Sequence, residues 1–236
     1  MIFLLQEIIL QCHNALKSGQ LKQGDSIRLM YPIGKMLSLL PPDTILPKLE
    51  PILTPYLQEM QQNVGLPPSP QTKAKVIFHL KLLMTLFQTL DISHKDNEQA
   101  EAQQRKLNHP QPIAVMFPQI NPLLKQVAQV WVKDAEVMET LSSVLKQVVS
   151  TLQDDVRPFA QEIIMTLEHT YEAQPHSSTL DLARQFFVMY GNDQNMVPLI
   201  RPFLKSLIDR TMKEMRSTGN PSDFSELVAT FFQVSV

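Results

Sequence analysis

Three seven-residue segments of this chain, 47–53, 118–124 and 198–204, share one pattern. Each reads proline, any residue, Leu or Ile, any residue, proline and then two large apolar residues. Pro158 lies midway between the last two segments, so that successive prolines are 40 residues apart. Proline suits the first turn of a helix because its φ angle is already helical and its missing N–H costs nothing there. Helix starts with a period near 40 residues are typical of HEAT-type solenoids.

The composition favours helices over strands. Leucine, glutamine, methionine and lysine are abundant, and only six of the 236 residues are glycine. With 44% apolar and 19% charged residues, the chain has the composition of a folded protein. We therefore predict an all-α fold, a HEAT-repeat α-solenoid in which antiparallel helix pairs stack as a right-handed superhelix. Residues 1–236 would form a single array of about five repeats.

The apolar periodicity places the helices. We expect them at about 1–18, 26–40, 43–64, 71–90, 113–132, 134–151, 155–172, 177–190, 194–217 and 221–234. The polar stretch 91–112 breaks the rhythm and predicts a long surface loop inserted between two helices. Both ends of the chain are apolar, whereas solenoids close with polar repeats, and this predicts a fragment of a longer solenoid.

Local signals predict the helix ends. Gly19 should terminate the first helix, and Asp25 or Ser26 should cap the second. The pair Asp154-Asp155 could suggest a metal site, but its position just before Pro158 favours N-terminal capping of the next helix and complementation of its dipole.

Two helices show clear apolar stripes that predict a shared core. The first comprises Val156, Phe159, Ile163, Ile164 and Leu167, and the second comprises Leu199, Ile200, Phe203, Leu204, Leu207 and Ile208. For the central Phe159 we expect truncation to Ala to cost roughly 3–5 kcal/mol.

No pattern predicts catalysis or a cofactor. Cys12 and His13 are adjacent, and neighbouring helical residues point about 100° apart, so they would not form a catalytic pair. The histidines lack metal-ligand spacing, and the sequence contains no glycine-rich phosphate loop and no GxSxG elbow. We predict that the protein is not an enzyme, and that His79 and Trp131 are packing residues.

Charge and hydropathy exclude two classes of partner. The net charge of −2 and the pI near 6.3 argue against binding of nucleic acid through phosphate neutralisation. No apolar run is long enough to span a membrane. The single cysteine fits a reducing compartment.

The most basic predicted helix is the segment 194–217. Its basic residues could simply lie on a face exposed to solvent. Alternatively, they could line the inner side of the solenoid and contact an acidic surface of a partner. We expect inner helices at about 43–64, 113–132, 155–172 and 194–217. The candidate protein-binding residues on them are Arg201, Lys205, Lys213, Arg216, Glu168 and Glu172.

Four segments give the chain a family resemblance. They are Leu-Asp-Ile-Ser-His at 90–94, Trp-Val-Lys-Asp-Ala-Glu-Val at 131–137, Thr-Leu-Gln-Asp-Asp at 151–155 and Ser-Thr-Leu-Asp-Leu-Ala-Arg-Gln at 178–185. In this order they resemble the C-terminal half of a nuclear transport receptor of the karyopherin-β family, which is built from HEAT repeats. The stretch 96–112 and the tail beyond residue 191 depart from the family's pattern.

This resemblance implies a Ran-regulated carrier that moves protein cargo between the cytoplasm and the nucleus. The member that the chain resembles imports a Mago-containing heterodimer and a SUMO-conjugating enzyme, and exports a translation initiation factor. In this family the main Ran-GTP site lies in N-terminal repeats outside this chain, and nucleoporins are further partners. The family has no catalytic residues to transfer to this sequence.

Two other functions are compatible with helical repeats. One is a static HEAT scaffold or adaptor subunit, for which we would expect more uniform repeats near 39 residues. The irregular proline-rich segment near residue 50 and the insertion at 91–112 favour the carrier instead. The other is an enzyme, against which the missing catalytic motifs argue.

Overall fold

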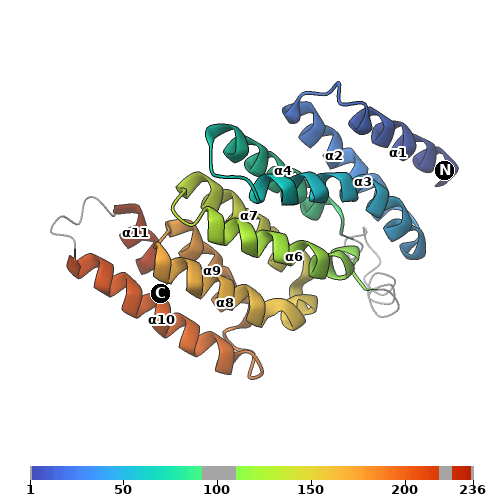
Figure 1. Cartoon of the computed structure of the whole chain (residues 1–236). Helices are drawn as coiled ribbons and strands as arrows, with labels where there is room; N and C mark the ends of the chain where they lie inside the picture. The colour runs from blue at the N-terminus through green and yellow to red at the C-terminus, as the bar shows by residue number, and fades with distance from the viewer. Residues whose placement is uncertain (1, 92–109, 218–224, 235–236) are drawn as a thin grey trace. The chain divides into compact units, whose positions relative to one another are not determined.

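The computed structural model describes residues 2–91, 110–217 and 225–234, and every regular element in these ranges is a helix (Figure 1). The helices are α1 (Ile2–Lys17), α2 (Gln23–Ser38), α3 (Pro42–Val64), α4 (Pro70–Thr89), α6 (Pro112–Val130), α7 (Ala135–Leu152), the 3₁₀ helix η1 (Gln153–Val156), α8 (Arg157–Ala173), α9 (Ser177–Tyr190), α10 (Val197–Ser217) and α11 (Ser225–Val234). All ten predicted helices are present, with ends that differ from the predictions by a few residues.

The chain divides into two compact units, Met1–Leu123 and Leu124–Val236, with the boundary inside α6. In the first unit, α2 packs against α4, α3 also contacts α4, and α1 contacts α2. The buried side chains come from the apolar stripes of these helices, for example Ile33 and Leu37 on α2 and Leu80 and Leu83 on α4. Gly34 of α2 lies directly against Thr89 at the end of α4.

In the second unit, successive helices pack into two alternating rows. Helix α9 packs between α7 and α11, whereas α8 packs against α10. Each helix therefore contacts the helix two positions along the chain, as expected for stacked helix pairs.

Polar contacts in this unit join residues about one repeat apart. Ser142 contacts Ser178, 36 residues on, and the Tyr171 hydroxyl lies 2.6 Å from Thr211 Oγ1, 40 residues on. Lys125 Nζ reaches Glu162 Oε2 at 2.9 Å across 37 residues. The spacing of these contacts matches the 40-residue period of the prolines, because equivalent positions of successive repeats face one another.

One of the three predicted helix caps is correct. Gly19 follows the end of α1 with a φ of +68°, the left-handed conformation that glycine adopts after a helix. Neither Asp25 nor Ser26 caps α2, because that helix already begins at Gln23 and both residues lie in its first turn. Lys22 occupies the capping position in an extended conformation without a side-chain hydrogen bond.

The predicted cap at Asp154-Asp155 is also wrong. These residues form the 3₁₀ helix η1, which continues directly into α8, so the residue before α8, Val156, has helical dihedral angles. No extended residue remains there to receive the N–H groups of the first turn. Asp154 Oδ1 instead accepts a hydrogen bond from Arg157 Nη2 at 3.1 Å.

Caps that the sequence analysis missed occur on two other helices. Ser69 and Thr72 form a reciprocal capping box at the start of α4. Asp134 Oδ1 accepts the Val137 N–H at 3.1 Å and caps α7, which therefore starts at Ala135 rather than at residue 134.

The predicted apolar stripes are partly buried. Val156, at the end of η1, and Ile163, Ile164 and Leu167 on α8 are buried. Phe159 is only half-buried because it lies in the first turn of α8, near its end. The cost expected for truncating Phe159 was therefore too high. On α10, Ile200, Phe203 and Leu207 are buried, whereas the remaining members of the stripe, Leu199, Leu204 and Ile208, are half-buried.

The predicted insertion 91–112 lies mostly outside the described residues. Its two ends are joined, because the buried Gln111 donates from Nε2 to Asp91 Oδ1 at 3.0 Å. This contact holds the end of α4 next to the start of α6.

Candidate protein-binding surface

Helix α10 carries four of the six candidate residues, and its local sequence explains its position. Backbone N–H groups of Met196 and Val197 bond to the Asp193 carbonyl in the turn before the helix. Ile200, Phe203, Leu207 and Thr211 then anchor one face in the core. Arg216, in the last turn, complements the partial negative charge at the helix C-terminus.

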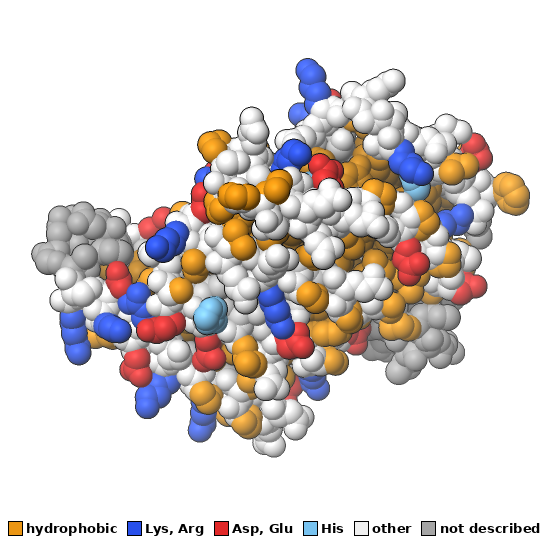
Figure 2. All heavy atoms as spheres, viewed as in Figure 1, with side chains coloured by type: hydrophobic (Ala, Val, Ile, Leu, Met, Phe, Trp, Pro, Cys, Tyr) orange, Lys and Arg blue, Asp and Glu red, His pale blue; other side chains and the backbone are white. Residues whose placement is uncertain are grey.

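The opposite face of α10 presents a basic stripe, which we define as Arg201, Lys205, Lys213 and Arg216. All four side chains are exposed. At 3.6 residues per turn they fall within an arc of about 120°, which also contains Asp209. Figure 2 shows Lys and Arg side chains in blue along the lower left of this view, over α10. The structure therefore brings the four predicted cations onto one surface.

Arg210 has a different environment from the basic stripe. Its Nε donates to the Glu172 carbonyl at 3.0 Å, and its Nη1 pairs with Glu214. Its guanidinium thus links α10 to α8. Within residues 2–91, 110–217 and 225–234, by contrast, no ion pair is found for any member of the basic stripe.

The two acidic candidates on α8 are separate from the basic stripe. Glu172 Oε2 lies 3.8 Å from Arg210 Nε, on the side of α10 that faces α8. Glu168 is half-buried, and burial raises the pKa of its carboxyl group. The six candidates therefore do not form one site; the cations share a face and the carboxylates belong to the α8 side.

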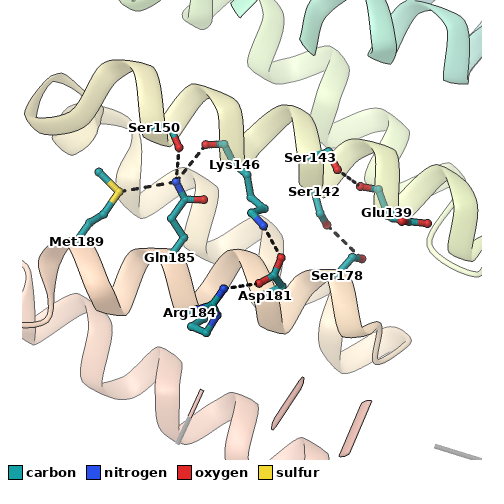
Figure 3. Close-up of polar contacts among 10 residues, drawn as sticks. All are labelled: Glu139, Ser142, Ser143, Lys146, Ser150, Ser178, Asp181, Arg184, Gln185 and Met189. Carbon is teal, nitrogen blue, oxygen red and sulfur yellow. Dashed lines mark hydrogen bonds and ion pairs between the residues drawn. The ribbon is translucent and has the colours of Figure 1, made fainter. Parts of the chain in front are cut away.

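A second surface, which sequence reasoning missed, is a polar hollow of about 310 Å³ over α7, α9 and α11. Its lining is rich in hydroxyl groups and carboxylates: Glu139, Ser142, Ser143, Ser177, Ser178, Asp181, Glu226 and Thr230, together with Ala135, Lys146 and His176. Figure 3 shows Ser142 and Lys146 of α7 pointing toward Ser178 and Asp181 of α9. No motif marks it, because its residues come from three helices.

Asp181 is the electrostatic centre of the α7–α9 contact. It pairs with Lys146 through Oδ2 and accepts from Arg184 Nη2 through Oδ1 at 3.1 Å (Figure 3). Burial raises the pKa of its carboxyl group, but the hydrogen bonds and charges of Lys146 and Arg184 outweigh burial and leave that pKa below its usual value. Gln185 adds hydrogen bonds to Ser150 Oγ and the Lys146 carbonyl.

His79 and Trp131 are packing residues, as predicted. His79 is 1% exposed, and its Nδ1 lies 2.6 Å from the Lys75 carbonyl, to which it donates. Desolvation lowers the pKa of its imidazole, more than the nearby Glu59 carboxylate raises it. Trp131 is buried at the end of α6.

The remaining candidates for chemistry have ordinary surroundings. Burial raises the pKa of the Cys12 thiol, which lowers its thiolate fraction. No group of three or more potential metal ligands occurs in the described part of the chain. None of the helices in those ranges is long and apolar enough to cross a membrane.

Comparison with known proteins agrees with the fold. The family described as "Transportin-3/Importin-13 fourth TPR domain" matches residues 109–215. Importin-13 of Gallus gallus and of Homo sapiens are each 30% identical to the chain over 216 residues, which is 90% of this chain and 22% of each relative. A solved structure described as importin13 in a cytosolic state superposes with a TM-score of 0.82 at 27% identity, covering 99% of this chain and 26% of that one.

The stacked helix pairs define the class of the protein: an all-α segment of HEAT-type helical repeats. The particular protein that the chain resembles is importin-13, so the predicted resemblance and fold class are confirmed. The chain spans about a fifth of the length of the curated relatives that it matches.

Proposed function

We propose that this chain is the part of a nuclear transport receptor that contributes contacts to protein cargo during Ran-dependent transport between cytoplasm and nucleus. The similarity to importin-13 over 90% of the chain carries this proposal. The Mago-containing heterodimer, the SUMO-conjugating enzyme and the translation initiation factor are the cargo classes to test first. Ran would bind mainly to repeats outside this chain, and nucleoporins would be additional partners.

The physical properties of the fold support a binding role. Each helix contacts only its near neighbours, so small rotations between helix pairs can add up and adapt the surface to a partner. A large surface with scattered charged and apolar contacts suits recognition of folded proteins better than recognition of a small molecule.

The proposed cargo contacts are the exposed faces of the predicted inner helices. The basic stripe on α10 supplies four cations, and Glu168 and Glu172 supply carboxylates on the adjoining α8. Within the described part of the chain these cations have no ion pair, so they are available to carboxylates of a partner, which raises the association rate and the specificity of binding.

The test uses a full-length receptor that contains this segment. The receptor is immobilised, loaded with purified cargo and washed with Ran bound to GTP or to GDP. We expect the nucleotide to change the amount of cargo retained, with import cargo released by Ran-GTP. Equal retention with the two nucleotides would refute the carrier and favour the static scaffold.

A further inference from the structure

The basic stripe of α10 consists of two pairs of cations. Arg201 and Lys205 are one helical turn apart, and Lys213 and Arg216 form the second pair near the end of the helix. At a rise of 1.5 Å per residue, the centres of the two pairs lie about 17 Å apart. Asp209 lies between them and supplies the only acidic side chain on this arc.

The two pairs are held in fixed positions by the buried face of the same helix. Phe203, within the first pair, and Leu207, between the two pairs, are almost completely buried. Thr211 Oγ1 donates to the Leu207 carbonyl at 2.7 Å and lies 2.6 Å from the Tyr171 hydroxyl. Fixing the helix fixes the spacing of its charges. A partner therefore meets charges that are already arranged, with little cost in backbone ordering.

An apolar group accompanies the second pair. Met212 is 38% exposed and lines a shallow hollow of about 450 Å³ together with Asp209, Lys213, Arg216 and Ser217. An exposed methionine next to cations is typical of protein interfaces, in which an apolar centre is surrounded by a polar rim.

We infer that the exposed face of α10 binds an acidic protein segment that carries two groups of carboxylates about 17 Å apart and one apolar side chain beside the second group. The carboxylates pair with Arg201 and Lys205 at one end and with Lys213 and Arg216 at the other, while the apolar side chain contacts Met212. Asp209 disfavours a carboxylate at the centre of the segment. This inference rests on the proposed function, because it specifies the chemistry of a cargo contact.

The spacing can be tested with two synthetic peptides of equal composition. The first is a helical, fluorescein-labelled peptide with two glutamate pairs whose centres are about 11 residues apart and a leucine beside the second pair. The second peptide carries the same residues with its four glutamates contiguous. Fluorescence anisotropy with the full 236-residue chain at low salt should give at least tenfold tighter binding of the first peptide.

Charge-reversal variants locate the binding surface. R201E/K205E and K213E/R216E should each weaken binding of the first peptide at least tenfold, and Met212→Ala should weaken it severalfold without a change in charge. K35E/K81E is the matched control, because it changes the net charge equally at exposed lysines on α2 and α4. It should alter the dissociation constant by less than twofold. Circular dichroism melts of all variants check that each remains folded.

Three results would overturn the inference. They are equal affinity for the two peptides, equal loss in the K35E/K81E control, and full displacement of the peptide by an equimolar RNA oligonucleotide, which would indicate unspecific polyanion binding. A different result would refute the proposed function. If the peptide results hold but Ran nucleotide state has no effect on cargo, the carrier is refuted and the acidic partner stands.

Discussion

At the scale of single residues, the contact between α2 and α4 depends on the absence of a side chain at Gly34. A Cβ atom added there would lie 1.9 Å from Thr89 Oγ1 and 2.9 Å from Thr89 Cβ. Thr89 cannot easily move, because its hydroxyl donates to the Thr85 carbonyl at 2.8 Å and the residue is buried. Glycine at this position therefore reflects close helix packing and not backbone conformation.

We predict that Gly34→Ala destabilises the protein. Overpacking costs about 1–3 kcal/mol, which exceeds the gain of about 0.5–1 kcal/mol when alanine replaces glycine in a helix. Urea denaturation should show a lower midpoint. The control is Gly24→Ala in the same helix, where a Cβ meets nothing within 4 Å, so that variant should be neutral or slightly stabilised. Equal midpoints for the two variants would contradict this account of the α2–α4 contact.

His79 makes stability depend on pH. Desolvation holds the folded-state pKa of its imidazole below the ordinary value of 6.5, so the unfolded chain takes up the proton first as the pH falls. The contribution of His79 to stability is therefore complete above pH 6.5 and decreases as the pH falls from 6.5 toward the folded-state pKa. Asp181 does not contribute in this range, because its pKa is below 3.8.

We expect His79→Gln to reduce this pH dependence, since glutamine does not titrate. The measurement is the urea midpoint of the original chain and of the variant at pH 7 and at pH 5. The midpoint of the original chain should fall more between the two pH values. An identical fall in the variant would show that His79 is not the responsible group.

At the scale of helices, α8 and α10 are joined by a buried hydrogen bond between successive repeats. Thr211 Oγ1 donates to the Leu207 carbonyl at 2.7 Å, so the Tyr171 hydroxyl must be the donor in its 2.6 Å contact with Thr211. Burial raises the pKa of Tyr171 to about 12, so the hydroxyl keeps its proton at physiological pH.

We predict that Tyr171→Phe costs about 1–3 kcal/mol, because it leaves the buried Thr211 oxygen without its donor. The double variant Y171F/T211V removes both polar groups and should be more stable than the sum of the single effects implies. A double-mutant cycle from urea denaturation measures the difference. Strict additivity would mean that this bond does not couple α8 to α10.

Most of the helices could be predicted from the sequence, because apolar periodicity and proline report directly on helix faces and helix starts. The burial of particular side chains could not be predicted in this way. Phe159 belongs to the predicted stripe of its helix, yet its place in the first turn of α8 leaves it half-exposed. Aspartate precedes both α7 and α8, but only Asp134 is a cap. Asp134 has an extended backbone, whereas Asp154 and Asp155 lie in a 3₁₀ helix that runs directly into α8.

The candidate site was predictable in part for the same reason. Spacing along one helix places Arg201, Lys205, Lys213 and Arg216 on one face, and the structure agrees. Contacts between helices are not encoded in such spacing. For this reason no sequence pattern predicts that Arg210 binds Glu172, or that α7, α9 and α11 line a polar hollow.

At the scale of the whole molecule, the 40-residue period connects sequence and fold. In the second unit, contacts between residues 35 to 40 positions apart recur in Lys146–Asp181, Arg210–Glu172 and Tyr171–Thr211. Such contacts join neighbouring repeats only, so stability is a sum of local interfaces and no single core dominates. A partner that contacts several repeats can then shift many small interfaces at once.

The most direct test of the central claim, that this segment contributes to cargo binding, is the dissociation constant of a full-length receptor for its cargo. We predict that reversing the four charges of the basic stripe raises this constant at least tenfold and leaves Ran-GTP binding unchanged. A cargo dissociation constant that stays within twofold of the original value would contradict the account.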